Sequence, residues 1–567
     1  MKLTGAQILI ECLVEQGVDT VFGYPGGSVL NIYDELYKSS DRIHHILTAH
    51  EQGASHAADG YARASGKVGV CIATSGPGAT NLVTGIATAY LDSVPVVFIT
   101  GNVNVSLIGK DSFQEADIAG ITTPITKHNF IVKDVKDLAE TVREAFEIAR
   151  TGRPGPVLVD IPKNVTAETA EYTPEQIDTA RKVSPVSAEA ETGIEELAEM
   201  IRKHNKVFLL CGGGALLSGA SDEITKLAEL IKAPVGTTLM GTGGIPSSHP
   251  NFTGMIGMHG TRATNVAVSE SELFIALGSR FNDRVTGDVN KFCKNAKIVQ
   301  IDIDAAEINK NVRTAHHIKG DVKNVLKRLL EVLKSGPLET AEREQWLSAI
   351  QTLKLPVRAL RHAGFSPKAI ITEVQHHLPK DAIIVTDVGQ HQMWAARYYN
   401  YELPNTFITS GGFGTMGYGA GAAMGAAVAR QDRKVVLFTG DGSFRMNSNE
   451  LATMQHYGIP VIILVMNNGV LGMVRQWQTV FYGKRYSQTN LDRGPDFAKL
   501  AEAYGLKGYT VCSLEQFDEA FEQALAAGET AVIDCRIGCD ETITPMVAPG
   551  KPITEFVLHE HETPEQK

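Results

Sequence analysis

The sequence predicts an α/β protein built from three doubly wound domains, each around a parallel β-sheet. Apolar runs of strand length alternate with helical patterns along the chain, as repeated strand–helix units do in parallel sheets. The chain has 567 residues, which is too long for a single hydrophobic core. Ten runs have the composition of buried strands, and they cover residues 68–76, 94–101, 155–162, 206–214, 272–279, 296–304, 382–389, 435–442, 460–468 and 530–538.

Two stretches without apolar strands divide the chain. One is polar and lies near residues 167–190, and the other is charged and helical and lies near residues 334–360. The expected parts are therefore domains at 1–180, 188–335 and 362–545 and a C-terminal tail at 546–567.

Two helical segments could be mistaken for signals of export or membrane insertion. Residues 1–17 have the pattern of an amphipathic helix with acidic residues, so they do not resemble a signal peptide. Residues 417–429 are small and apolar, but this run is shorter than a bilayer span. We expect a tightly packed helix of a soluble protein there.

Composition disfavours several classes of function. The net charge is −11 and no dense Lys/Arg run is visible, so neither nucleic acid nor a membrane is an expected partner. The seven cysteines are scattered without paired spacing, which favours reduced thiols in a cytoplasmic protein and gives no support for zinc.

The most informative motif lies at residues 440–468. A helical pattern separates two apolar strands, which end near Asp441 and Asn468. Because neighbouring parallel strands end at one edge of a sheet, we expect these two side chains to lie together. Their oxygens suit Mg²⁺ bound to a phosphate, which Gly440 and Gly442 would let the backbone approach. Simple β-turns at the strand ends are the alternative, which the spacing of the full pattern disfavours.

This pattern resembles the GDG…NN signature of the thiamin diphosphate (ThDP) enzymes. The resemblance implies that Asp441, Asn468 and the backbone of Val470 hold Mg²⁺ against the diphosphate. It also implies that Glu51, in EQGASHAADGYARASG, contacts N1′ of the aminopyrimidine, and that Met416 supports the bent cofactor. Taken alone, Glu51 is more simply an acid favoured by a helix dipole, and Met416 is a core filler.

The whole chain, from near residue 3 to near residue 550, resembles the catalytic large subunits of biosynthetic acetolactate synthases (acetohydroxyacid synthases). The motifs include TSGPGATNLVTGIATAY, SRFNDRVTG, GDGSFRMNSNELAT and NNGVLGMVRQW. The resemblance implies a pyrimidine-binding domain, a central FAD-associated domain and a diphosphate-binding domain. Further ThDP contacts are implied at Pro77, Asn81, Gly389, Gln390, His391, Gly440, Gly442, Ser443 and Met473.

The same resemblance places FAD across the central domain. By itself the glycine run after residue 211 is only a phosphate-compatible loop or an ordinary tight turn, because it lacks the GxGxxG register. RFNDRVTG is the strongest flavin motif of the chain. The implied FAD positions are Arg153, Gly212, Gly213, Gly214, Thr238, Leu239, Met240, Met258, His259, Gly278, Arg280, Asp283, Arg284, Asp302, Ile303, Asp321 and Val322.

Substrate recognition also rests on the resemblance. It assigns Phe113, Gln114, Lys163, Arg284 and Trp477 to the active-site entrance, with the last four acting beside Glu51 in catalysis. A guanidinium such as that of Arg284 can bind a 2-ketoacid carboxylate through two hydrogen bonds. Each of these residues alone would more often be a surface charge or a core aromatic.

The function implied is a ThDP-, Mg²⁺- and FAD-dependent transferase of branched-chain amino-acid biosynthesis, which leads to isoleucine, valine and leucine. Such an enzyme decarboxylates pyruvate and transfers the hydroxyethyl carbanion to a second pyruvate or to 2-ketobutyrate, giving 2-acetolactate or 2-aceto-2-hydroxybutyrate. A homodimer or homotetramer and a small regulatory subunit are implied as well. One alternative is another ThDP/FAD enzyme of this architecture, such as a pyruvate oxidase or a different carboligase. The other is a catalytically silent subunit, which the intact Glu51, Asp441 and Asn468 disfavour.

Overall fold

The computed structural model describes residues 1–179, 183, 185–354 and 364–557. The predicted domain limits at residues 180 and 362, and the end of the predicted tail, lie outside these residues. The chain forms two compact units. The first unit comprises Met1–Lys182, Ala382–Gln392 and Ile408–Cys539, and the second comprises Val183–Asp381, Met393–Phe407 and Asp540–Lys567. Three six-stranded sheets, two in the first unit and one in the second, confirm the predicted fold class.

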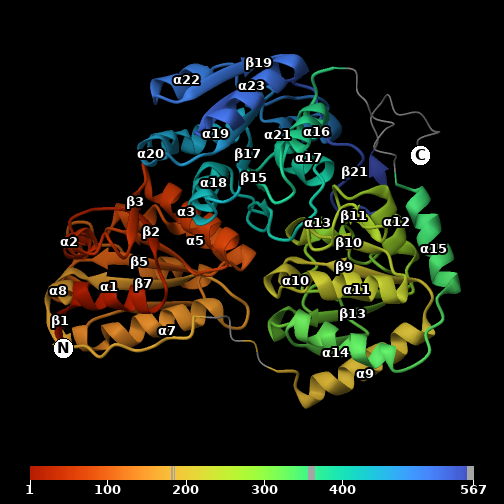
Figure 1. The fold of residues 1–567 in the computed structure, drawn as a ribbon, viewed down its shortest axis with the longest axis horizontal. Helices are drawn as coiled ribbons and strands as arrows, with labels where there is room; N and C mark the ends of the chain where they lie inside the picture. Colours follow the sequence, from red (N-terminus) through yellow and green to blue (C-terminus); the bar gives the residue numbers. More distant parts are fainter. Residues whose placement is uncertain (180–182, 184, 355–363, 558–567) are drawn as a thin grey trace. The chain divides into compact units, whose positions relative to one another are not determined.

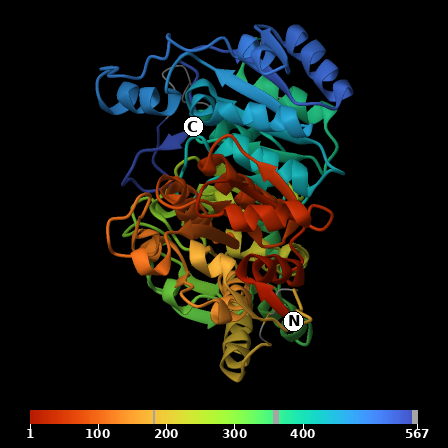
Figure 2. The ribbon, with the colours of Figure 1, turned by 90° about the vertical axis from the view of Figure 1, so that its left-hand side faces the viewer.

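The N-terminal sheet is parallel and lies between two helical layers (Figures 1 and 2). Across the sheet, its strands are β3 (His44–Leu47), β2 (Thr20–Tyr24), β4 (Gly69–Ala73), β5 (Val96–Asn102), β7 (Val157–Pro162) and β6 (His128–Ile131). One layer holds α1 (Gly5–Glu15), α2 (Leu30–Lys38) and α7 (Leu138–Arg150), and the other holds α3 (Glu51–Ser65) and α5 (Val83–Asp92). The predicted start of the N-terminal helix is wrong. Residues Lys2–Thr4 form strand β1, which pairs with β8 (Thr169–Glu171), and the helix begins after them.

The C-terminal sheet, in the same unit, carries the GDG…NN motif. Its strands are, across the sheet, β16 (Phe407–Ile408), β15 (Ile383–Thr386), β17 (Val435–Gly440), β18 (Ile462–Asn467), β20 (Ala531–Arg536) and β19 (Lys507–Val511). Its helices include α18 (Tyr418–Ala429), α19 (Asp441–Asn447), α20 (Leu451–Tyr457), α21 (Gly472–Phe481), α22 (Phe497–Ala503) and α23 (Leu514–Ala527). The predicted crossover helix is present as α20, and α19 begins directly at Asp441.

Helices α3 and α18 join the two sheets of the first unit. Buried side chains form one continuous core from Phe98 of β5 through both helices to Leu437 of β17. Small residues allow the close approach, since a Cβ at Gly425 would lie 1.9 Å from the Ala57 carbonyl oxygen. The burial of residues 418–427 confirms that the predicted apolar helix is packed inside the protein (Figure 1).

The central sheet lies in the second unit and is parallel throughout. Its strands are, across the sheet, β11 (Phe252–Met255), β10 (Val235–Thr237), β9 (Val207–Cys211), β12 (Leu273–Leu277), β13 (Lys297–Asp302) and β14 (His316–Lys319). The helices of this unit include α9 (Ala188–Lys203), α10 (Gly213–Leu217), α11 (Ser221–Ile231), α12 (Arg262–Glu270), α13 (Asp283–Thr286), α14 (Val322–Lys334), α15 (Ala341–Thr352) and α16 (Pro367–His377). The ten predicted strands are therefore all confirmed.

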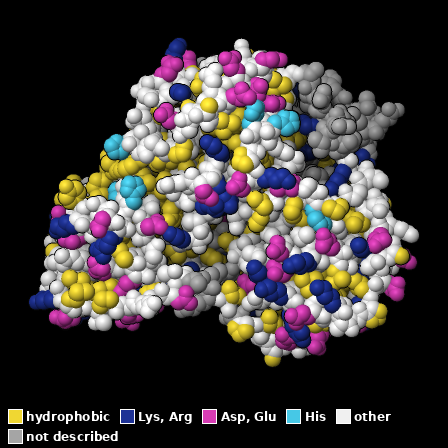
Figure 3. Space-filling view, in the orientation of Figure 1, with side chains coloured by type: hydrophobic (Ala, Val, Ile, Leu, Met, Phe, Trp, Pro, Cys, Tyr) yellow, Lys and Arg dark blue, Asp and Glu magenta, His cyan; other side chains and the backbone are white. Residues whose placement is uncertain are grey.

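The surface and the cysteines agree with the composition. All seven thiols are free, and five of them are buried. On the face that Figure 3 draws, Lys and Arg are interspersed with Asp and Glu. Within the described ranges, we find no helix that combines the length and the apolar character needed to cross a bilayer.

Candidate active site

The carboxyl edge of the C-terminal sheet brings the two halves of the GDG…NN motif together. Strands β17 and β18 pair in parallel with Gly440 opposite Met466, so Asp441 and Asn468 follow neighbouring strands at one edge. Asp441 is 3% exposed, and burial raises the pKa of its carboxyl to about 6. The Asn468 side-chain oxygen accepts the N–H of Val470 at 3.1 Å. A buried carboxylate beside an amide oxygen fits a hard divalent cation, which would keep the carboxylate ionised.

The start of helix α17 (Gln390–Tyr398), which follows β15, completes this edge with side chains that lie near the same two strands. Asn468 donates a hydrogen bond to the Gln390 oxygen at 3.2 Å, and Gln390 donates to Gln476 of α21 at 2.9 Å. The His391 ring packs on Gly440, where a Cβ would lie 2.9 Å from Nδ1.

His391 also supplies a polar atom that fits a ligand. Burial lowers the pKa of His391 to about 3, and its Nε2 has no hydrogen-bond partner among the described residues. Buried polar atoms are normally hydrogen-bonded. This buried nitrogen lies next to the Gly440–Asp441 turn and leaves a hydrogen-bonding position for a bound group.

Glu51 is the first residue of α3, and its carboxylate is buried against the turn after β4. Asn81 donates a hydrogen bond to Glu51 Oε2 at 2.9 Å. The other carboxylate oxygen lies against Gly78, where a Cβ would be 3.1 Å from Oε1. Pro77 begins the short helix α4 (Pro77–Thr80) of the same turn. Predicted residues Glu51, Pro77 and Asn81 therefore lie together.

The loop that carries Met416 is held by buried hydrogen bonds from several elements. Asp387, directly after β15, accepts the backbone N–H groups of Val388 and Gly417, each at 2.9 Å. Burial raises the pKa of Asp387 to about 6. The Met416 methyl group lies 3.8 Å from the position of a Cβ on Gly442, so the predicted prop points at the predicted diphosphate turn.

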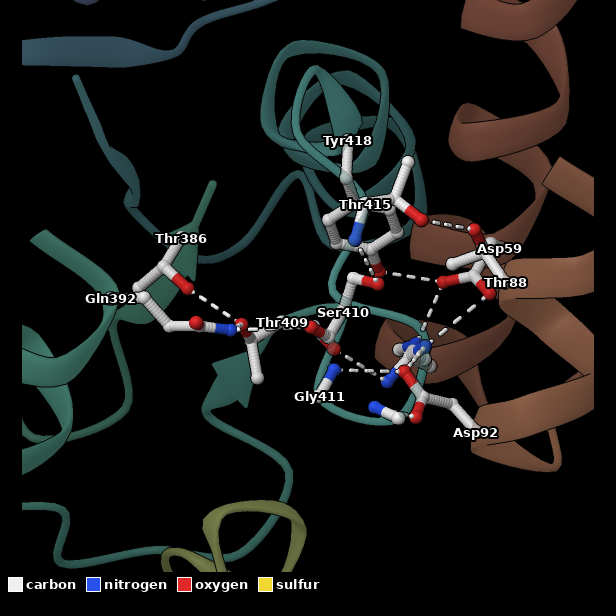
Figure 4. A network of polar contacts seen from close by, with 12 residues as sticks. Asp59, Thr88, Asp92, Thr386, Gln392, Thr409, Ser410, Gly411, Thr415 and Tyr418 are labelled. Carbon is white, nitrogen blue, oxygen red and sulfur yellow. Dashed lines mark hydrogen bonds and ion pairs between the residues drawn. The ribbon is translucent and has the colours of Figure 1, made fainter. Parts of the chain in front are cut away.

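An ion-pair network fixes the other end of this loop (Figure 4). Asp92 of α5 accepts the backbone N–H groups of Gly411 and Gly412 at 3.1 and 2.7 Å. Arg63 of α3 links Asp92, at 2.9 Å, to Asp59, at 2.7 Å. Both carboxylates are fully buried, and such pairs keep a defined geometry because breaking one leaves an uncompensated charge.

The predicted entrance residues are more exposed and are not all brought together by described contacts. Gln114 has φ +58°, and its backbone packs against Gly76, next to Pro77. Phe113 is 88% exposed, and Lys163 is exposed at the end of β7. Trp477 lies in α21, and its ring packs edge-on against the ring of Phe481, with the ring centroids 5.6 Å apart.

Arg284 and Asp283 belong to the second unit. They form an exposed ion pair at 3.1 Å at the start of α13. Their predicted roles stay predictions.

The predicted FAD positions of the second unit gather at the carboxyl edge of the central sheet. After β9 the chain adds β10 and β11 on one side of that strand, and it then adds β12, β13 and β14 on the other side. The strand order therefore reverses between β9 and β12, which is a topological switch point. There the N–H of Gly214 donates to the Gly278 carbonyl at 3.0 Å. Other predicted positions lie at or just after the ends of β10, β11, β12, β13 and β14 and are Thr238, Leu239, Met240, Met258, His259, Arg280, Asp302, Ile303, Asp321 and Val322.

Individual side chains at this edge fit a bound group to different degrees. The buried Nδ1 of His259 has no hydrogen-bond partner in the described part of the chain, and burial lowers the pKa of this ring to about 3. Asp321 has a structural task as well, because it caps α14 by accepting the Asn324 N–H at 3.2 Å. Arg153, in the first unit, donates to Ser93 at 2.8 Å.

Comparison with known proteins places the chain in a family. Three family models match it, described as the N-terminal TPP binding domain, the central domain and the C-terminal TPP binding domain of thiamine pyrophosphate enzymes, at residues 3–121, 194–329 and 387–535. The probable acetolactate synthase large subunit of Methanocaldococcus jannaschii is 48% identical, over 98% of this chain and 95% of that protein.

Two further relatives give the same result. The acetolactate synthase of Arthrospira platensis is 47% identical, over 97% of this chain and 96% of the relative. The acetolactate synthase of Mycobacterium bovis is also 47% identical, over 97% of this chain and 90% of the relative. The chain thus belongs to the thiamine pyrophosphate enzymes and, among these, to the family of acetolactate synthase large subunits.

Proposed function

We propose that the protein is a ThDP-dependent transferase that forms 2-acetolactate from two pyruvates, or 2-aceto-2-hydroxybutyrate from pyruvate and 2-ketobutyrate. The observation that carries this proposal is the buried edge at which Asp441, Asn468 and the unpartnered His391 nitrogen follow three neighbouring strands. Relatives that match 97–98% of the chain bear the name of this activity.

Mg²⁺ and FAD are part of the proposal. Asp441, Asn468 and the Val470 carbonyl would hold Mg²⁺, while the carboxyl edge of the central sheet would hold FAD. When bound, ThDP would supply a nucleophilic carbon for the ketoacid carbonyl and a thiazolium ring that accepts the electron pair left by CO₂. The chain's own residues then orient the reactants and move protons.

Glu51 would exchange a proton with N1′ of the aminopyrimidine, and Asn81 would hold its carboxylate toward that atom. Met416 would fill the bend of the cofactor. Gln114, Lys163 and Arg284 would bind the carboxylate and carbonyl groups of the ketoacids, for which a guanidinium and an ammonium are suited.

The direct test is an assay of purified protein with pyruvate, ThDP, Mg²⁺ and FAD. We expect CO₂ and 2-acetolactate in a ratio of about one to one, since one pyruvate is decarboxylated for each product formed. Acetaldehyde as the main product would indicate a simple decarboxylase. A flavin that is reduced by pyruvate would favour a pyruvate oxidase, and absence of ThDP-dependent pyruvate consumption would identify a silent subunit.

We also propose that the protein works as a homodimer or homotetramer and binds a small regulatory subunit. Three large apolar side chains in segments of the predicted site are exposed in the single chain. They are Phe113 at 88%, Phe413 at 49% and Met446 at 53%. In an oligomer another chain would cover these groups, although single exposed apolar residues are also common on monomers. The large-subunit names of relatives support the regulatory partner.

Trp477 is proposed to favour 2-ketobutyrate as the acceptor. One methylene against an apolar ring contributes about 0.8 kcal/mol, and a shaped pocket discriminates by about 1–3 kcal/mol. Trp477→Leu should therefore lower the preference for 2-ketobutyrate over pyruvate by about tenfold while the rate with pyruvate alone changes little. The measurement is competition between the two ketoacids with both products quantified.

A core tryptophan provides the matched control. Trp346 is 7% exposed in the second unit, so Trp346→Leu should lower stability and both products together. If Trp477→Leu behaves in the same way, with an unchanged product ratio and a lower melting temperature, Trp477 has a packing role only.

A further inference from the structure

Glu450 is a buried carboxylate in the C-terminal domain that contacts the N-terminal domain. It lies in the short turn η7 (Ser448–Glu450) between α19 and α20, and it is fully buried. Its Oε2 accepts the Ala49 N–H at 3.1 Å, and its Oε1 accepts the His50 N–H at 3.2 Å. Thr453 donates a further hydrogen bond to Oε2 at 2.7 Å.

The first turn of α3 packs directly on this carboxylate. A Cβ at position 53 would lie 2.0 Å from Glu450 Oε1, and glycine avoids this clash because it has no Cβ. Two turns further along, at the end of α20, the Tyr457 hydroxyl accepts the Leu47 N–H at 2.9 Å. Helix α20 and the turn before it therefore hold three backbone N–H groups of the segment from Leu47 to His50.

A carboxylate is a costly group to bury for packing alone. Burial raises the pKa of Glu450, and the three hydrogen bonds it accepts oppose that shift. What these bonds fix is the segment that ends directly before Glu51. Asn81 holds one oxygen of the Glu51 side chain, and Glu450 holds the backbone from which that side chain departs.

We propose that Glu450 is a positioning residue for Glu51, holding residues 49–50 so that α3 begins with the Glu51 carboxylate at the aminopyrimidine. This inference rests on the proton-transfer role proposed for Glu51. Displacing a catalytic group by about 1 Å can lower a rate by about 100-fold. Glu450 therefore acts on the chemistry without touching the cofactor.

The test is Glu450→Gln in the full-length protein. The amide keeps the shape but can accept only one of the two N–H groups, so hydrogen exchange of the Ala49 and His50 amides in the apoprotein should accelerate about tenfold. With Mg²⁺ and ThDP bound, exchange of the cofactor C2 proton should slow about tenfold or more. The Kd of ThDP and the KM of pyruvate should change less than about threefold, because the binding groups remain.

Two further variants keep the inference falsifiable. Glu502→Gln, on the exposed face of α22, should change none of these quantities. Thr453→Val removes one donor to Glu450 while leaving its charge, so it should give the same pattern with smaller effects even if Glu450→Gln fails to fold.

The outcomes separate the positioning role from the proposed function. If Glu51→Gln slows C2 exchange and Glu450→Gln loosens the two amides without slowing it, the positioning role is wrong and the function stands. If Glu450→Gln lowers the ThDP affinity and the melting temperature together, Glu450 has only a packing role, and this result would also overturn the inference. If neither glutamate affects C2 exchange, the role of Glu51 fails and the inference fails with it.

Discussion

Asp441→Ala should abolish the Mg²⁺-dependent retention of ThDP. A hard divalent ion would lose its only charged ligand in the proposed set of Asp441, Asn468 and the Val470 carbonyl, while the diphosphate keeps its negative charge. Loss of outer-shell groups alone weakens metal sites by about 10–100-fold, so we expect the Kd of ThDP to rise by more than about 100-fold. Titration of the apoprotein with ThDP, with and without Mg²⁺, measures this change.

The stability of the apoprotein distinguishes a ligand from a structural acid. Burial raises the pKa of Asp441 to about 6, so at pH 7 the folded apoprotein holds an ionised carboxylate that burial disfavours. Above pH 6 this carboxylate opposes folding, and its removal should leave the melting temperature of the apoprotein unchanged or higher. The exposed Asp432→Ala is the matched control for ThDP binding. Normal cofactor titration by Asp441→Ala would refute the proposed metal site.

The strands that the sequence revealed are those buried on both faces. Although the inner strand β2 (Thr20–Tyr24) was missed as well, most missed strands of the three sheets are short or lie at edges, such as β3 (His44–Leu47), β6 (His128–Ile131) and β14 (His316–Lys319). Their histidines and half-exposed positions interrupt the apolar run by which a central parallel strand is recognised. The edge strands were therefore missing from the prediction, whereas the parallel pairing of β17 with β18, which positions Asp441 and Asn468, was predicted.

Site residues divide in the same way. Asp441 and Asn468 could be placed at one edge because each directly follows an apolar strand, and parallel pairing then fixes their neighbourhood. Asp92 and Glu450 carry no such local signal. Glu450 lies 400 residues from His50, which it contacts, and the packing of the two domains, which includes α3 against α18, brings the two segments together.

Glu51→Gln should leave ThDP bound but slow the exchange of its C2 proton by about 100-fold or more. General acid–base groups raise reaction rates by about 10²–10⁴-fold, and an amide cannot exchange a proton with N1′. Packing should survive, because the amide oxygen of Gln can still accept the hydrogen bond that Asn81 donates at 2.9 Å. We therefore expect a Kd for ThDP within about fivefold of the wild-type value, since the proposed diphosphate and metal contacts are untouched.

The experiment follows C2 exchange by NMR after dilution of the ThDP-loaded protein into deuterated buffer. Glu140→Gln, an exposed glutamate of α7, is the control for the loss of one negative charge. The alternative for Glu51 is an acid that stabilises the first turn of α3 through the helix dipole, which is typically worth 0.3–1 kcal/mol, or roughly 2–5-fold in an equilibrium constant. That role predicts a small fall in melting temperature with normal exchange, so unchanged exchange in a slightly less stable variant would remove Glu51 from the chemistry.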